Sequence, residues 1–322
     1  MPYHVLIADS VDPAAVELLR QAPGLTVTAP GGMARADVLA AIASADALII
    51  RSATTADAEL LAAAPHLKVV ARAGVGVDNV DLPSATRQGV IVMNTPDGNT
   101  IATAEHALGL LLALARHIPD SEISMRGGRW DRKAFMGVEL RGKTLGIIGF
   151  GRIGRAVAKR ALAFEMTVIT ADPYILADVA ADFGVELVDL DTLYARADFI
   201  TLHSVITDET RGMINAASLA KMKRGVRIVN AARGALIDER ALAEAIVSGQ
   251  VAGAALDVYS AEPPPVDHPL VGLPGVVHTP HLAASTADAQ VNVAIDAAQL
   301  VLDALLKGEY RNVCNPDVLK SS

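Results

Sequence analysis

The stretch LGIIGFGRIG, at residues 145–154, decides the fold predicted for this chain. Its apolar first half predicts a buried strand, and the residues after it, 155–164, have a helical pattern. Between strand and helix, three glycines follow the spacing G-x-G-x-x-G, at Gly149, Gly151 and Gly154. The first permits a tight turn, the second lets the backbone approach a pyrophosphate, and the third lets the helix pack on the strand. Since the N–H groups at the helix N-terminus favour the same anion, the stretch predicts a dinucleotide site.

An acidic residue follows the next predicted strand. That strand covers residues 167–170 and leads to Asp172, 18 residues after Gly154. A carboxylate at this point accepts hydrogen bonds from the ribose hydroxyls and repels a 2′-phosphate. The alternative is an ordinary glycine-rich turn followed by an Asp that caps a helix before Pro173. Because strand, turn, helix and acid are all in register, we favour the cofactor site, and the predicted cofactor is NAD rather than NADP.

Short β-branched runs alternate with Ala-rich helical segments along the whole chain, which is typical of parallel sheets covered by helices. We therefore expect an α/β fold with two doubly wound parallel-sheet domains and an active-site cleft between them. The substrate-binding domain would comprise residues 1–98 plus 287–322, and the larger, Rossmann-type NAD-binding domain residues 99–286. The predicted strands are 5–8, 26–28, 48–50, 69–71, 91–93, 145–148, 167–170, 199–202, 227–229, 254–256 and 276–277.

Composition excludes several classes of protein. The 322 residues are 52% hydrophobic and 20% charged, which is typical of a globular chain. A formal charge of -8 argues against nucleic acid or an anionic membrane as the main partner. The only cysteine, Cys314, can form neither an internal disulfide nor a multi-cysteine metal site. We therefore expect no metal site. The start of the chain lacks the basic segment of a secretory signal, and its apolar runs are too short to cross a membrane, so we expect no membrane span and a cytoplasmic location.

Three loops that follow predicted strands carry candidate reacting groups: NAARG (230–234), DVYSAEPPP (257–265) and HTPHLAAS (278–285). A hydride transfer from an alcohol needs a base for the hydroxyl proton and a cation for an acidic substrate. Arg233 offers the cation, and Glu262 and His281 offer the acid and base groups. Taken singly, each is as easily a surface arginine, a solvated loop acid or a loop histidine.

Together with the glycine motif, these segments resemble the NAD-dependent D-2-hydroxyacid dehydrogenases. The resemblance covers nearly all of the chain. The matching segments are IRSAT (50–54), RAGVGVDN (72–79), MNTP (93–96), GFGRIG (149–154), NAARG (230–234), ALDV (255–258) with EP (262–263), and PHL (280–282).

The resemblance implies a role for each matching residue. Arg233 would orient the substrate, Glu262 would be the acid partner and His281 the acid/base. A carboxylate beside the imidazole would favour its protonated form. Besides the glycines, the implied cofactor contacts are Val75, Arg152, Ile153, Asp172, Ser204, Ala231, Asp257 and Ala284.

Within the family, the chain is most similar to enzymes that oxidise 3-phospho-D-glycerate to 3-phosphohydroxypyruvate, the first step of serine biosynthesis. A dianionic phosphate needs further cations, and Arg51 and Arg72 are at the matching positions. Backbone N–H groups of the glycine-rich segment 74–76 could hold the carboxylate, and Ala73 and Gly74 are counted among the substrate-binding residues. Arg132 lies in a loop, WDRKAFMG (130–137), that can reach a neighbouring subunit in such enzymes, or it is a solvated turn.

Other functions fit the same scaffold, because function depends on the site rather than the fold. The alternatives are a glyoxylate/hydroxypyruvate reductase or another D-2-hydroxyacid dehydrogenase and, more remotely, a non-catalytic NAD-sensing protein that resembles corepressors. Ala283 departs from the family, which often has Gly there, and matters only where a positive φ is needed. The end at Ser322 suggests a short form without a serine-binding regulatory domain.

We also expect a homodimer or homotetramer. The apolar segment 101–117 is the candidate subunit interface, and its alternative is a helix buried inside one domain.

Overall fold

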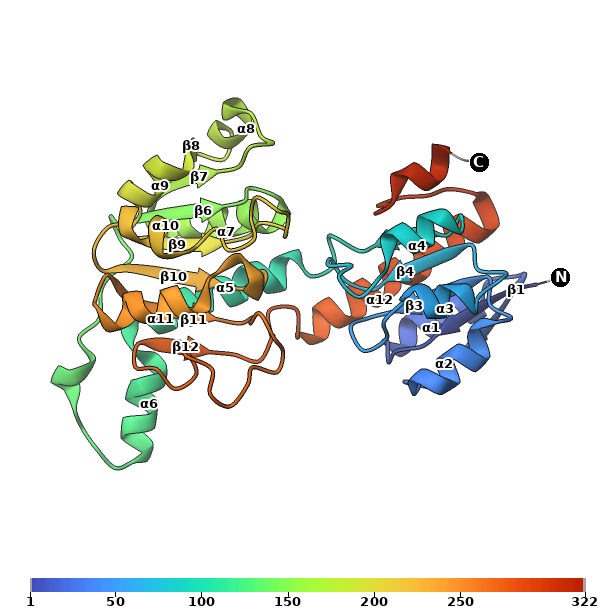
Figure 1. The fold of residues 1–322 in the computed structure, drawn as a ribbon, viewed down its shortest axis with the longest axis horizontal. Coiled ribbons are helices and arrows are strands. Elements are labelled where there is room, and N and C mark those ends of the chain that lie inside the picture. Colours follow the sequence, from blue (N-terminus) through green and yellow to red (C-terminus); the bar gives the residue numbers. More distant parts are fainter. Residues whose placement is uncertain (1, 321–322) are drawn as a thin grey trace. The chain divides into compact units, whose positions relative to one another are not determined.

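The computed structural model describes residues 2–320, which divide into two compact units (Figure 1). Unit 1 combines the chain up to Asn99 with the chain from Ser285 onward, and unit 2 is Thr100–Ala284. The division predicted from the sequence, at 98/99 and 286/287, differs from these borders by one and two residues. The last two residues of the expected segment 287–322 lie outside the described residues.

Unit 1 is a five-stranded parallel sheet with helices on both faces. The strands, in the order β2-β1-β3-β4-β5, are β1 (Tyr3–Ile7), β2 (Leu25–Thr28), β3 (Ala47–Ile50), β4 (Val69–Arg72) and β5 (Ile91–Asn94). One core contains side chains of α1 (Pro13–Arg20) and α12 (Ala287–Leu302). The opposite core contains side chains of α2 (Arg35–Ile42), α3 (Ala58–Ala62) and α4 (Leu82–Arg87). Short turns of helix at Asp303–Lys307 and Pro316–Lys320 complete the unit.

Helix α12 is long and rich in apolar side chains. With the turn after it, residues Ala287–Lys307 are long and apolar enough to cross a membrane, with a mean hydropathy of 1.3. However, 61% of that segment's apolar window is buried. Its buried side chains, among them Val293, Ala297 and Val301, pack on α1 and the sheet. The apolar character of α12 is therefore explained by the core of unit 1.

Unit 2 is a seven-stranded sheet whose strands are all parallel, in the order β12-β11-β10-β9-β6-β7-β8. The strands are β6 (Thr144–Ile148), β7 (Thr167–Ala171), β8 (Glu186–Leu187), β9 (Phe199–Leu202), β10 (Val226–Asn230), β11 (Val251–Leu256) and β12 (Val276–His278). From β6 the chain first builds outward through β7 and β8, and then returns to add β9 on the other side. Ligands of such sheets bind where the strand order reverses, beyond the carboxyl ends of the strands.

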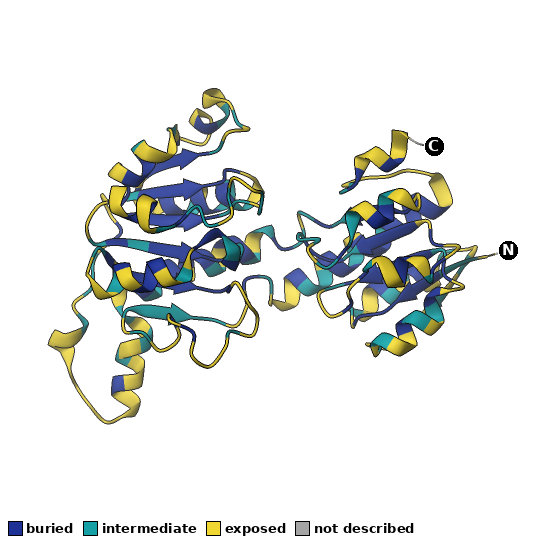
Figure 2. Cartoon of the chain, viewed as in Figure 1, coloured by how far each residue is buried: buried dark blue, intermediate teal, exposed yellow. Residues whose placement is uncertain are grey.

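The helices of unit 2 cover both faces, and two cores separate the sheet from them (Figure 2). They are α5 (Thr100–Arg116), α6 (Ile118–Arg126), α7 (Arg152–Ala163), α8 (Ala177–Ala181), α9 (Leu190–Arg196), α10 (Ala216–Lys221) and α11 (Glu239–Val247), with 3-10 turns η1 (Arg132–Phe135) and η2 (Gly234–Leu236). Both cores use strand residues of alternating orientation, as expected for a sheet buried on two faces.

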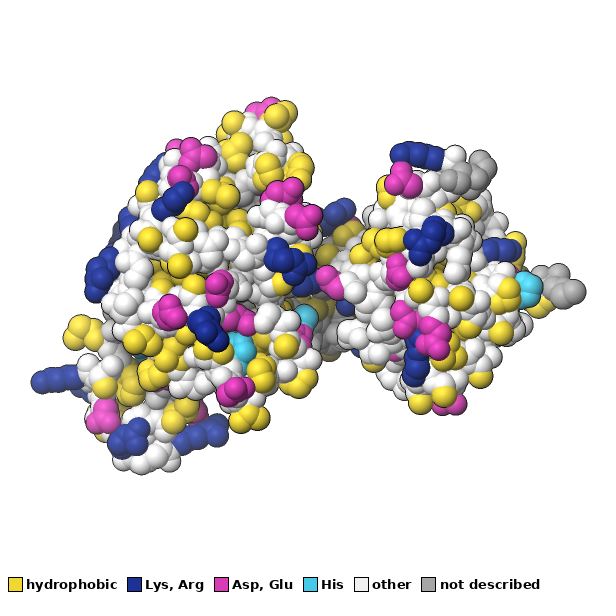
Figure 3. Space-filling view, viewed as in Figure 1, with side chains coloured by type: hydrophobic (Ala, Val, Ile, Leu, Met, Phe, Trp, Pro, Cys, Tyr) yellow, Lys and Arg dark blue, Asp and Glu magenta, His cyan; other side chains and the backbone are white. Residues whose placement is uncertain are grey.

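Most apolar side chains of helix α5 are buried inside unit 2. Its apolar side chains, such as Leu108, Leu111 and Leu114, are buried in unit 2 against α7 and the sheet. This face of α5 is therefore buried as in the alternative, and a subunit interface on the rest of the helix stays a prediction. Exposed apolar side chains occur instead just after it, on α6 and the segment through η1, where Trp130 is 74% and Met136 is 81% exposed. Figure 3 shows basic side chains beside apolar ones on this projecting segment.

Candidate active site

The three glycines of the motif between β6 and α7 are explained by different features of the structure. Gly149 has φ +94°, and a Cβ there would lie 2.8 Å from the His203 carbonyl and the Ser204 nitrogen. A Cβ on Gly154 would overlap the carbonyl oxygen of Gly149, so helix and turn could not pack as closely. By contrast, a Cβ on Gly151 would meet nothing within 4 Å. The open side of the turn is therefore at Gly151, the N-cap of α7, where no side chain caps the helix. This geometry fits a pyrophosphate.

Asp172 ties the end of β7 to the glycine-rich turn. One carboxylate oxygen accepts the Phe150 N–H at 2.7 Å and the other accepts the Tyr174 N–H at 2.9 Å. Ser204, after β9, donates its hydroxyl to the Ile148 carbonyl at 3.2 Å. Asp172 thus lies beside the turn, where a carboxylate can meet the ribose of a dinucleotide.

The other residues implied as cofactor contacts in unit 2 also lie at ends of strands or helices. They are Arg152 and Ile153 in the first turn of α7, Ala231 after β10, Asp257 after β11 and Ala284 at the end of the unit. Val75 belongs to unit 1.

Asn230, the last residue of β10, shapes the loop that carries Arg233. Its side chain is almost fully buried, donates to the Arg233 carbonyl at 2.8 Å and accepts the Ala232 N–H at 3.0 Å. The Arg233 guanidinium donates to the Ala232 carbonyl at 2.7 Å. Gly234 then lies so close to the backbone of Tyr259 that a Cβ would overlap it. The Arg233 loop and the Glu262 loop are consequently in direct main-chain contact.

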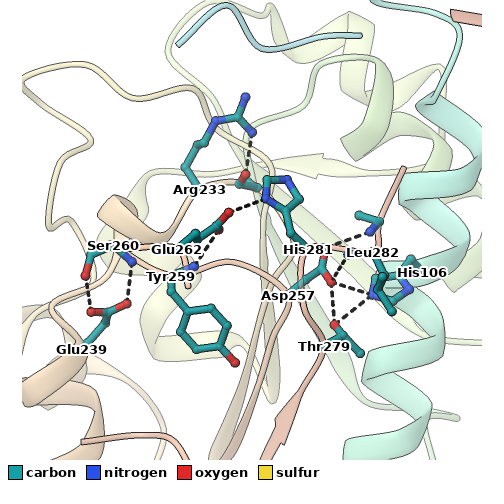
Figure 4. Close-up of polar contacts among 12 residues, drawn as sticks. His106, Arg233, Glu239, Asp257, Tyr259, Ser260, Glu262, Thr279, His281 and Leu282 are labelled. Carbon is teal, nitrogen blue, oxygen red and sulfur yellow. Dashed lines mark hydrogen bonds and ion pairs between the residues drawn. The ribbon is translucent and has the colours of Figure 1, made fainter. Parts of the chain in front are cut away.

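Glu262 and His281 are joined by a hydrogen bond across two loops. The distance from His281 Nδ1 to Glu262 Oε2 is 2.7 Å, and Oε1 of Glu262 accepts the Tyr259 N–H at 3.1 Å. Figure 4 shows the Glu262 carboxylate pointing at the imidazole ring, with Arg233 on the neighbouring loop. Because the carboxylate accepts, Nδ1 carries the proton and Nε2 is left for a substrate. Both side chains are exposed in unit 2, at 51% for His281 and 38% for Glu262.

His281 has a left-handed backbone, with φ +54°. The turn around it is held by Asp257, whose main-chain carbonyl accepts the His281 N–H at 2.8 Å. Ala283 is not among the described residues with positive φ, so the Ala that departs from the family carries no backbone strain there. The strained residue of this segment is the histidine itself.

The Asp257 carboxylate is fully buried and accepts four hydrogen bonds. They come from the Thr279 hydroxyl at 2.6 Å, His106 Nε2 at 3.1 Å, and the N–H groups of Leu282 at 2.7 Å and Ala283 at 2.9 Å. Burial by itself would raise the pKa of Asp257, but these donors outweigh it and the pKa lies below its ordinary value. Asp257 therefore remains a carboxylate and organises the His281 turn.

Sequence reasoning gave no role to Asn230 or His106. The signal for Asn230 was present, because an Asn at a strand end commonly bonds the backbone two residues later. His106 carried no signal, since its partner is 151 residues away.

In unit 1, Arg51 and Arg72 follow or end the neighbouring parallel strands β3 and β4. The Arg51 N–H donates to the buried carboxylate of Asp9 at 2.6 Å, and its guanidinium donates to the Ser10 carbonyl at 3.2 Å. The Arg72 guanidinium lies in the space that a Cβ on Gly74 would occupy, and Gly74 has φ +144°.

Two N–H groups at the start of the glycine-rich segment of unit 1 are used internally. The Ala73 N–H donates to the Ile50 carbonyl at 2.8 Å, and the Gly74 N–H donates to the Thr95 hydroxyl at 2.7 Å. The Gly74 N–H is thus engaged inside unit 1, and binding of a substrate carboxylate by the segment 74–76 stays a prediction. Arg132 lies exposed on η1 of unit 2.

The fold and site of unit 2 define a class of protein. A parallel sheet with a glycine-rich turn at its switch point, and an imidazole–carboxylate pair beside an arginine at its carboxyl edge, is the arrangement of a dinucleotide-dependent dehydrogenase.

Comparison with known proteins defines the family. Residues 108–283, more than half of the chain, match the D-isomer specific 2-hydroxyacid dehydrogenase, NAD binding domain, and the chain belongs to this family. It is 49% identical over 311 residues to a D-3-phosphoglycerate dehydrogenase of Archaeoglobus fulgidus, covering 97% of this chain and 59% of the relative. Identity to the enzyme of that name from Mycobacterium tuberculosis is 53% over 306 residues, covering 95% of this chain and 57% of the relative. The chain thus spans less than two thirds of these relatives.

A solved structure resembles the chain over almost its whole length. The glyoxylate reductase from Paecilomyes thermophila has a TM-score of 0.88 and 33% identity, and the match covers 97% of this chain and 98% of that one. The two-unit α/β architecture is therefore that of the family.

Proposed function

We propose that this chain oxidises 3-phospho-D-glycerate to 3-phosphohydroxypyruvate with NAD, by reversible hydride transfer at C2, as the first step of serine biosynthesis. The main support for this type of reaction is the hydrogen bond of 2.7 Å between His281 and Glu262. It places the ring proton on Nδ1, so that Nε2 can act as a base. The names of the two relatives support the choice of substrate.

In this mechanism, His281 Nε2 accepts the C2 hydroxyl proton, and Glu262 stabilises the imidazolium that forms. Arg233 pairs with the substrate carboxylate and stabilises charge on the C2 oxygen. Bound NAD supplies the hydride acceptor. In the reverse direction, His281 returns the proton to the keto oxygen, so that one group serves both directions.

The phosphate is assigned to the arginines of unit 1. Arg51 and Arg72 are at neighbouring strand ends and offer planar donors suited to a phosphate. The competing substrate is the unphosphorylated acid, in keeping with the likeness to a glyoxylate reductase.

A paired initial-rate assay separates the two substrates. NADH absorbance would be followed with 3-phosphohydroxypyruvate and with hydroxypyruvate, and each would be repeated with NADPH. We expect kcat/KM at least ~100-fold higher for the phosphorylated acid, equivalent to ~2.7 kcal/mol. Equal rates or a preference for hydroxypyruvate would reject the phosphate assignment and leave the reaction type standing.

We propose further that the protein is cytoplasmic and forms a homodimer, or a homotetramer built on it, through α6 and the segment that ends at η1. The support for the dimer is the exposure of Ile123, Met125, Trp130 and Met136 on one continuous stretch of chain. Arg132 is part of this stretch. Replacing both Trp130 and Met136 with Ser should reduce the mass in sedimentation to that of a monomer, and a wild type that is already monomeric at micromolar concentration would refute the dimer.

A further inference from the structure

His106 links a helix outside the reacting loops to the turn that carries His281. It lies on α5, with 22% of its side chain exposed, and its Nε2 is 3.1 Å from Asp257 Oδ1 and 3.2 Å from Thr279 Oγ1. Helix α5 packs against β10, β11 and β12, the strands that lead into the three loops. The imidazole thus approaches the network from a rigid element of the core (Figure 4).

The partners of Nε2 define which ring nitrogen carries the proton. Asp257 remains a carboxylate and can only accept, and the Thr279 hydroxyl already donates its proton to Asp257 Oδ1 at 2.6 Å. Nε2 must therefore carry a hydrogen, which it shares between the carboxylate and the Thr279 oxygen. His106 is thus the donor that comes from outside the 279–283 segment, since the other three donors to the carboxylate are Thr279, Leu282 and Ala283.

Those three donors cannot orient the carboxylate independently, because they belong to the segment being held. The N–H groups of Thr279 and His281 tie this segment to the carbonyls of Leu256 at 3.0 Å and Asp257 at 2.8 Å, but these bonds do not orient the carboxylate. A donor on α5 orients the carboxylate from outside the segment. The strained backbone of His281, at φ +54°, makes a fixed support more important, since such conformations persist only where their surroundings determine them.

We propose that His106 is a positioning residue for the acid/base histidine: its Nε2–H fixes the Asp257 carboxylate, and the carboxylate fixes the turn from which His281 meets the substrate. His106 touches neither substrate nor cofactor in this role. The catalytic part of the inference rests on the proposed function, whereas the structural part concerns the turn alone.

Two amide variants of His106 test whether it positions the turn, because their side-chain amides extend to different distances from the helix. In His106→Gln the side-chain amide reaches the place of Nε2, whereas in His106→Asn it reaches only the place of Nδ1. Both are uncharged and polar, so solubility is matched. Glu105→Gln is the control, because Glu105 is the preceding residue on α5, is exposed and pairs with Arg160 at 2.9 Å, away from the network.

The first measurement is amide hydrogen exchange at Leu282 and Ala283 in the cofactor-free protein. We expect exchange about tenfold faster in His106→Asn, near wild type in His106→Gln and unchanged in Glu105→Gln, because a tenfold change corresponds to the loss of one supporting hydrogen bond. Wild-type exchange in His106→Asn would overturn the proposal, as would equally fast exchange in both amide variants.

The second measurement separates kcat from KM for the hydroxy acid. Since Arg233 is not on the His281 turn, we expect His106→Asn to lower kcat about tenfold with little change in KM, and His106→Gln to recover most of kcat. A loss confined to KM would overturn the catalytic role. If the wild type does not act on 3-phosphoglycerate, the proposed function fails, yet the exchange rates still decide whether His106 supports the turn.

Discussion

Replacing Gly234 with Ala should separate the loops that carry Arg233 and Glu262. A Cβ on Gly234 would overlap the carbonyl of Tyr259 and the nitrogen of Ser260, far inside the 3.0 Å that real Cβ atoms observe. The obstructing atoms are backbone, so no side-chain rotation can relieve the overlap. One loop must move, and Tyr259 also holds Glu262 through its N–H at 3.1 Å. The glycine is required here for close approach rather than for a positive φ.

The expected effect is large on activity and moderate on stability. Displacing a reacting group by about 1 Å can cost ~100-fold in rate, which is ~2.7 kcal/mol of transition-state stabilisation. Inserting a methyl group into a packed site typically costs ~1–3 kcal/mol of unfolding free energy. We therefore expect kcat to fall about 100-fold while the protein still folds and binds NADH, since the glycine-rich turn at Gly149 lies on another strand.

Initial rates of NADH oxidation would measure kcat, a fluorescence titration would measure NADH binding, and thermal unfolding would measure stability. Gly109→Ala is the matched control, because a Cβ at this position of α5 meets nothing within 4 Å. In a helix interior this change should stabilise by ~0.5–1 kcal/mol and leave kcat unaltered. If Gly234→Ala kept kcat within about threefold of wild type, the claim that loop contact sets the Arg233–Glu262 geometry would be refuted.

Three further predictions concern single side chains. His281→Asn should lower kcat by roughly 10²–10⁴-fold and spare NADH binding, and retained turnover would contradict its role as acid/base. Asp172→Ala should raise the ratio of kcat/KM for NADPH over NADH about tenfold, or ~1.4 kcal/mol, because the repulsion of a 2′-phosphate is removed, and an unchanged ratio would exclude this source of selectivity. For Asp257, burial tends to raise the pKa but the hydrogen bonds keep it below its ordinary 3.8, so the charged form contributes stability above that pH and loses it as pH falls through the folded value. The difference in unfolding free energy between wild type and Asp257→Asn, measured with urea, should therefore be largest near neutral pH and shrink on acidification below 3.8, and a constant difference would show that the charge is not involved.

The fold could be predicted well because both sheets are buried on two faces. Runs such as LGII at residues 145–148 are continuous apolar strands, and all eleven predicted strands overlap strands of the structure. Strand β8 was missed, because it comprises only Glu186–Leu187 at the edge of the sheet and contains no apolar run. The burial of α5 was also not determined by its sequence, since an apolar helix looks the same whether its partner is the same chain or another.

The contacts between segments that are distant in the sequence could not be predicted. The motifs predicted Arg233, Glu262 and His281 as candidate reacting groups at one edge of the sheet, because each follows a strand and parallel strands end at one edge. The groups that hold them were not accessible in this way. His106 and Asp257 are 151 residues apart, and no local pattern pairs them. The acceptors of the Ala73 and Gly74 N–H groups, Ile50 and Thr95, could not be predicted for the same reason, since they are more than 20 residues away.

The reacting groups are held together by main-chain contacts between three consecutive strand ends. The Asp257 N–H donates to the Asn230 carbonyl at 2.9 Å, and the Asp257 carbonyl accepts the His281 N–H at 2.8 Å, so the ends of β10, β11 and β12 are linked in series. All of these contacts lie within unit 2, whereas Arg51 and Arg72 belong to unit 1. Under the proposed function, acid/base chemistry would depend on the core of unit 2 and recognition of the phosphate on the core of unit 1. Because each core determines its own loops, a change at Arg51 or Arg72 would leave the loops of unit 2 in place, and under the proposed function the same scaffold could then serve phosphorylated or unphosphorylated hydroxy acids.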